Sequence, residues 1–188
     1  MKPIMAGFFL AGILLSGCVT RYDQNGTFQN AKLDPAGSAF IAIPQDGSYG
    51  PEHYPGSGTA TTQAVYSAFF PHVSHLIQAD TYASQSENFS KAKSVGCEYM
   101  IEPTILHWED RATEWDGLPD RIEIGIKIFD ATNALPICGI VISGASSWWT
   151  AGGDKPQDLL AKPIKDYADS LFQTNHPPPK ETKKSALK

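Results

Sequence analysis

The clearest pattern in the chain is an alternation of apolar and polar side chains over residues 121–129. Successive side chains of a β-strand point to opposite faces, so apolar residues at every second position share one face. These residues are Ile122, Ile124, Ile126 and Ile128. Arg121, Glu123 and Lys127 then lie on the other face. The pattern predicts a strand with one face in the core and the other in water or against a partner.

Apolar runs and turn residues predict seven more elements around this strand. They are strands at 39–44, 80–83, 98–108 and 137–149, and helices at 59–77, at 87–94 and from about residue 154 onward. Pro71 interrupts the first helical pattern and is expected to kink or split it. Gly96 can end the second helix in the left-handed conformation. The predicted order is β-α-β-α-β-β-β-α.

The fold class that this order indicates is α/β (α+β). A helix with an apolar stripe must bury it, and the isoleucine strand offers a matching surface. In the last helix that stripe consists of Leu160, Ile164, Tyr167 and Leu171. We therefore expect a two-layer sandwich, with a mixed sheet and the helices on one face.

The first residues have the form of an export signal. Lys2 is followed by an uncharged apolar run over residues 4–15, which is too short to span a bilayer that needs about 20 residues. The sequence Leu15-Ser16-Gly17-Cys18 resembles the lipobox of bacterial lipoproteins. That resemblance implies acylation of Cys18, removal of residues 1–17 and a partnership with the lipid bilayer. A second acyl chain makes such an anchor stable.

The rest of the chain divides into three parts. Residues 18–36 are polar and are expected to form a lipidated tether with a reach of about 25 Å. Residues 37–173 form one globular domain, and residues 174–188, rich in proline and lysine, are expected to be a disordered tail. Val19 follows the lipidated cysteine, and by resemblance to Gram-negative sorting rules it favours the outer membrane, with the domain in the periplasm.

Charge narrows the choice of partners. Removing residues 1–17 leaves 14 basic and 20 acidic groups in a mature chain of 171 residues. A net charge of −6 argues against nucleic acid as a partner, because such binding needs a clustered basic face. Cys97 and Cys138 are candidates for a disulfide, since the periplasm is oxidising, but each also fits a buried free thiol.

The densest polar cluster spans the turn between two long strands. It holds Trp108, Glu109, Asp110, Trp115 and Asp116. The tryptophans can stack on a sugar or anchor a protein, and the acids can bind a cation, but an ordinary solvated turn is the favoured explanation of the charges. Farther along the chain, the outward member of Trp148-Trp149, taken as Trp149, is a further contact candidate.

No motif indicates a cofactor or a metal. His72 and His75 have helical spacing that is compatible with zinc, yet no third ligand is marked nearby, so helix-end or surface histidines are the simpler interpretation. No nucleophile elbow, zinc-protease motif or phosphate loop occurs. We expect no cofactor and no metal.

Three segments carry a family resemblance, at residues 96–103, 108–115 and 152–160. Together they resemble an uncharacterised lipoprotein family, domain of unknown function DUF4823. The likeness implies a cellular location and a fold. It implies no catalytic or binding chemistry. The architecture is also similar to envelope accessory domains such as the amino-terminal domain of TolB, penicillin-binding-protein activators and the curli secretion lipoprotein.

Three functional hypotheses follow. The first is a non-enzymatic accessory lipoprotein that binds an envelope protein or peptidoglycan. The second is a self-assembling structural or secretion lipoprotein. The third, ranked last, is a cell-wall hydrolase that uses Glu109, Asp110 or Asp116 as acid and base.

Overall fold

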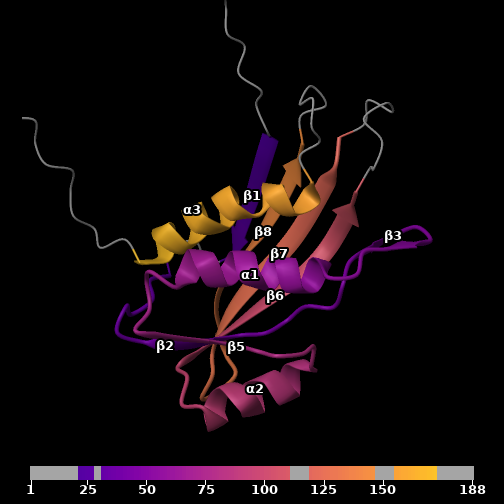
Figure 1. Cartoon of the computed structure of the whole chain (residues 1–188). Coiled ribbons are helices and arrows are strands. Elements are labelled where there is room, and N and C mark those ends of the chain that lie inside the picture. Colours follow the sequence, from indigo (N-terminus) through magenta and orange to yellow (C-terminus); the bar gives the residue numbers. More distant parts are fainter. Residues whose placement is uncertain (1–20, 28–30, 111–118, 147–154, 173–188) are drawn as a thin grey trace, which may run out of the picture.

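The fold is built on one mixed sheet. The computed structural model describes residues 21–27, 31–110, 119–146 and 155–172. Six strands lie in the order β1-β8-β7-β6-β2-β5 (Figure 1). Their bounds are Arg21–Thr27 (β1), Ser38–Ile41 (β2), His75–Gln78 (β5), Tyr99–Glu109 (β6), Arg121–Asp130 (β7) and Pro136–Ala145 (β8). The pairs β1–β8, β8–β7 and β7–β6 are antiparallel, whereas β6–β2 and β2–β5 are parallel.

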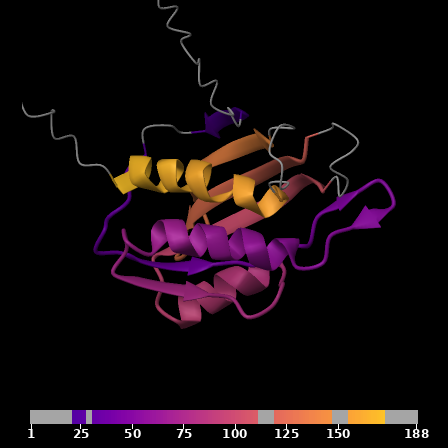
Figure 2. The same cartoon turned by 45° about the horizontal axis from the view of Figure 1, so that its top comes forward.

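Two helices cover one face of this sheet. They are α1 (Ser57–Phe69) and α3 (Ala161–Phe172), and α3 follows a short 3-10 helix, Pro156–Leu159. Figure 2 shows both helices lying across the strands on the same side. The isoleucines of β7 face them, and Ile124, Ile126 and Ile128 are fully buried there. The prediction of a one-sided isoleucine strand is confirmed.

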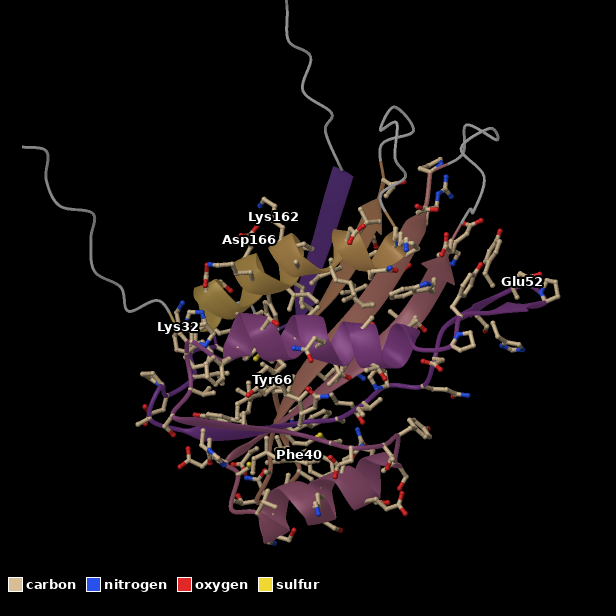
Figure 3. The ribbon with its side chains drawn as sticks, viewed as in Figure 1. Lys32, Phe40, Glu52, Tyr66, Lys162 and Asp166 are labelled. Atoms are coloured by element: carbon tan, nitrogen blue, oxygen red, sulfur yellow. The ribbon has the colours of Figure 1, made fainter. Side chains whose placement is uncertain are left out.

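The remaining helix, α2 (Gln85–Ser94), covers the opposite face at the β2–β5 end of the sheet. Phe40 of β2, which alternates with the buried Ala39 and Ile41, lies between the sheet and this helix (Figure 3). Phe89 of α2 meets Phe129 of β7 edge to face, with ring centroids 5.3 Å apart. The mixed sheet and the α+β class are as predicted, and so is the element order from β2 onward apart from the small hairpin Ser48–Tyr49 and Glu52–His53, which was not predicted. The arrangement differs in α2, which forms a third layer.

The first helix is shorter than predicted. It ends at Phe69, and residues 75–78 form β5, parallel to β2, so the strand expected at 80–83 was placed wrongly. Pro71 explains the break, because proline lacks the N–H that would continue the helix. Leu76 still packs against the helix-side core, now from a strand. Leu76 therefore lies on the core side, but in a strand and not in the predicted helix.

The amino-terminal segment also differs from the expectation. Residues 21–27, within the stretch expected to be a flexible tether, form β1 and pair with β8 from Arg21↔Ala145 to Thr27↔Gly139. Leu33 is buried, and its N–H donates to the carbonyl of Leu171 at 3.1 Å. The polar composition of residues 21–27 is compatible with an edge strand, which needs few core side chains. The packed domain thus begins before residue 37.

The end of α2 matches its prediction. Gly96 has φ of 74°, the left-handed conformation that favours glycine after a helix. At the other end of α2, the side chain of Ser84 accepts from the N–H of Glu87, and the Glu87 carboxylate accepts from the N–H of Ser84. This reciprocal cap satisfies two N–H groups that the helix leaves open.

Candidate functional site

The predicted hairpin cluster is only partly within the described residues. Trp108 and Glu109 end β6, and Asp110 follows as an exposed residue. Trp115, Asp116 and Trp149 lie outside the described residues. Whether these three form a binding surface stays a prediction.

Trp108 is a core residue and not a contact surface. Its side chain is 3% exposed and packs with the helix-side core. A bulge between Ile105 and His107 explains this orientation, because the extra residue reverses which side chains point inward. A Cβ placed on Gly47 would lie 2.6 Å from the Cβ of Trp108, so the loop before α1 closes over the indole only with glycine there. The predicted role of Trp108 in binding is wrong.

Glu109 is buried as well. It is 3% exposed, and one of its carboxylate oxygens lies 3.3 Å from Nε2 of His107. The His107 ring meets Tyr49 edge to face, with centroids 5.0 Å apart. Tyr49 belongs to a small hairpin, β3 (Ser48–Tyr49) and β4 (Glu52–His53), that lies beside β6. These contacts fix the end of β6 to the neighbouring loop, so Glu109 is placed as a structural acid.

Within the described residues, the sheet face opposite α1 and α3 has the features of a docking surface. We call it the open face, and define it by the outward side chains of β6, β7 and β8 that α2 leaves uncovered. They are Thr104, Leu106, Glu123, Gly125, Lys127, Val141 and Ser143. Leu106 is 53% exposed, and its Cδ1 would lie 3.8 Å from a Cβ on Gly125. The leucine therefore lies over the glycine of the next strand.

Sequence reasoning predicted this face and missed Leu106. The charges of β7 already indicated a side in water or against a partner. Leu106 was assigned to an ordinary strand and was not singled out as exposed. The bulge beside it, which returns Trp108 to the helix side, has no glycine or proline to mark it. Two signals were present, however. Leu106 follows Thr104 at the alternate spacing, and Thr104 pairs with a glycine of β7, Gly125.

The two cysteines of the domain do not pair. Both are free and buried, Cys97 in the cluster beside α2 and Cys138 in the helix-side core. These clusters lie on opposite faces of the sheet, so a bond between the two sulfurs would have to pass through it. Burial raises the pKa of both thiols, which keeps them protonated and unreactive. The candidate disulfide is therefore excluded.

The histidine pair is separated by the break after α1. His75 begins β5, whereas Nε2 of His72 lies 2.9 Å from Asp169 of α3, and its ring stacks on Phe172 with centroids 5.0 Å apart. Lys165 and then His72 lower the pKa of the Asp169 carboxyl by hydrogen bonding to it. This cluster joins the ends of α1 and α3. Within residues 21–27, 31–110, 119–146 and 155–172, no group of three His, Cys, Asp or Glu side chains could hold a metal ion.

Comparison with known proteins gives the family. The model of the family described as domain of unknown function (DUF4823) matches residues 31–171, three quarters of the chain. The chain belongs to the DUF4823 family. The match begins after β1. It includes the other strands of the sheet, α1, α2 and all of α3 but its last residue. No match to this DUF4823 chain was found among the curated proteins.

Solved structures are similar to this DUF4823 chain at low identity. The PelC dodecamer from Paraburkholderia phytofirmans has a TM-score of 0.61 and 11% identity, over 82% of this chain and 100% of that one. Protein XCC0632 from Xanthomonas campestris, of family DUF330, has a TM-score of 0.48 and 11% identity over 72% and 84%. Lipoprotein GNA1162 from Neisseria meningitidis has a TM-score of 0.47 and 10% identity over 72% and 99%. At these identities the likeness to PelC concerns the fold alone.

Across the described residues of the DUF4823 chain, no helix combines the length and the apolar character needed to cross a membrane.

Proposed function

We propose that this chain is a lipoprotein of the Gram-negative envelope, anchored in the outer membrane through acylated Cys18, with a non-enzymatic domain that binds an envelope protein. The lipobox-like sequence before Cys18 supports the anchor. The observation that carries the binding role is the open face, where Leu106 is 53% exposed on an otherwise regular sheet.

The two sides of the sheet differ in what covers them. Three long antiparallel strands form a rigid surface, and one side of it is covered by α1 and α3. The side that faces water presents Leu106, Thr104 and Val141 near the charged Glu123 and Lys127. An apolar centre with a charged rim is typical of the core and rim of a protein interface.

The positions of the acids favour binding over hydrolysis. A glycosidase-type mechanism needs two carboxyl groups that both reach the substrate. Glu109 is almost fully buried at the end of β6, beside His107. Asp110 is exposed next to it, and Asp116 lies outside the described residues. The buried acid is poorly placed to meet a polymer.

A second candidate is self-assembly. Both outer strands of the sheet, β1 and β5, have one neighbour each in the described part of the chain. An open edge can pair with another chain. The similar fold of PelC is that of a dodecamer, which makes a second copy a reasonable partner.

A photocrosslinking residue in place of Leu106 tests the binding role in intact cells. Leu135, a leucine that is 62% exposed in the β7–β8 turn, gives the matched control position. We expect a discrete adduct from position 106, and we expect it to be absent from position 135. Lys127→Glu, combined with the photocrosslinking residue at position 106, should lower the yield of the adduct. The substitution reverses a charge on the same face.

The mass of the adduct separates the two candidates. An adduct with a different protein supports the binding lipoprotein, and an adduct with twice the mass of the chain supports self-assembly. Equal adducts from both leucines, or none from position 106, would contradict a docking role of the open face.

A further inference from the structure

The start of β1 determines how far the domain can move from its anchor. Residues 21–27 pair with β8 along the whole strand, so the folded sheet begins at Arg21. Cys18 precedes that residue by three positions, with Val19 and Thr20 between them. An extended chain spans at most about 3.3–3.6 Å per residue, so Cys18 can lie at most about 10 Å from the sheet.

The place where this short connection joins the sheet is one end of four strands. Arg21 pairs with Ala145, Ala145 pairs with Arg121, and Arg121 pairs with Glu109. These residues form one row across β1, β8, β7 and β6, which we call the anchor row. In Figure 1 the row lies at the top of the sheet, and α2 lies at the bottom.

The opposite end of the sheet is far beyond the reach of the connection. Strand β7 has 10 residues, and at about 3.3 Å per residue it carries the chain roughly 30 Å away from the anchor row. The β7–β8 turn lies at that far end. In the sheet order, β2 and β5 are also the strands most distant from β1. A 10 Å connection therefore allows only part of the domain surface to meet the bilayer.

We infer that the anchor row faces the bilayer, with the strands leading away from it, so that α2, β5 and the β7–β8 turn point into the aqueous space. The inference rests on the proposed acylation of Cys18. The chain enters β1 at the anchor row, and the acyl chains on Cys18 must lie in the hydrocarbon. The partner of this end of the sheet is a lipid surface.

The charges of the anchor row permit this contact. The row holds Arg21, Arg121 and the buried Glu109, and the exposed Asp110 follows Glu109. These two bases and two acids give the four residues no net formal charge that would repel lipid headgroups. The open face then stands beside the membrane with its strands rising from it, and a partner can approach the face from the aqueous space.

Fluorescence quenching by lipid tests this orientation on the full acylated chain. The chain is reconstituted into phosphatidylethanolamine–phosphatidylglycerol vesicles that contain a nitroxide-labelled headgroup lipid. A fluorophore is attached in separate variants to Arg121→Cys, Leu135→Cys or Lys93→Cys, all at exposed positions. The native Cys97 and Cys138 are buried and serve as the unlabelled background. We expect quenching at position 121 to exceed that at positions 135 and 93 several-fold.

A linker variant gives the matched control. Twelve Gly and Ser residues inserted between Thr20 and Arg21 lengthen the connection without changing the sheet, and a flexible connection samples many orientations. The several-fold difference between position 121 and the other two positions should then shrink toward equality.

The outcomes separate this inference from the proposed function. Similar quenching at all three positions of the acylated, vesicle-bound chain would overturn the orientation and leave the anchor intact. A purified chain without fatty acid in its intact mass, or one that stays off the vesicles, would overturn the proposed anchor and the orientation with it.

Discussion

Replacing Cys18 with serine is expected to remove all fatty acid from the protein and to eliminate it from the outer-membrane fraction. The hydroxyl of serine does not accept the thioether-linked lipid that the lipobox-like sequence implies. Residues 1–17 are expected to remain attached, since in lipoproteins of this type cleavage follows acylation of the cysteine. Intact-mass measurement and membrane fractionation check both points.

The domain supplies a matched control for this prediction. Cys97→Ala removes a different thiol, which is buried beside α2. This variant should keep its fatty acid and its place in the membrane fraction. Acylation of the Cys18→Ser chain, or equal loss of fatty acid from both variants, would contradict the anchor.

The second large effect is expected at Phe69. The last residue of α1 is fully buried in the helix-side core, and its ring meets Phe172 edge to face with centroids 6.2 Å apart. Truncation of a buried phenylalanine to alanine costs about 3–5 kcal/mol, through lost burial and the cavity left behind. Domains of this size have about 5–15 kcal/mol of unfolding free energy, so Phe69→Ala should lower the urea midpoint greatly.

The neighbouring phenylalanine is the control. Phe70 is 60% exposed and stacks on Tyr66, with ring centroids 5.6 Å apart. Phe70→Ala removes this pair and little buried surface, so the cost is expected to be about 0.5–1.5 kcal/mol. Equal costs for the two substitutions would show that α1 does not present Phe69 to the core as described.

The order of the helices and of the main-sheet strands from β2 onward could be predicted from the sequence, because long periodic segments carry strong signals. Four isoleucines at alternate positions defined β7 and its buried face. The final helix was predicted from an apolar stripe, and Ile164, Tyr167 and Leu171 are buried as that stripe required. These elements bury enough apolar surface for the local pattern and the tertiary structure to agree.

The remaining features depend on partners distant in the sequence. The strand β1 has few apolar residues and is held by backbone pairing with β8, which a local pattern does not reveal. The choice of face for α2 follows from Phe40, Met100 and Phe129, which come from three different strands. The bulge at Leu106 places Trp108 in the core. No glycine or proline in the sequence indicates this bulge.

The candidate site was predicted less well than the fold, for a related reason. Two of the six residues singled out, Trp108 and Glu109, are buried. A tryptophan has the same sequence signature whether it fills a core or contacts a partner. Only the positions of Gly47 and of the bulge decide between these roles, and both belong to the tertiary structure.

The pairing of β1 with β8 also sets an order of events during export. In the proposed route the amino end leaves the translocation channel first, so Cys18 and β1 reach the periplasm while β8 is still on the other side. The strand has no partner at that time, and the adjoining cysteine is accessible to the enzymes that modify it. In this route Cys18 is therefore accessible to acylation before the sheet closes, and β8, the last strand to emerge, completes the sheet afterwards.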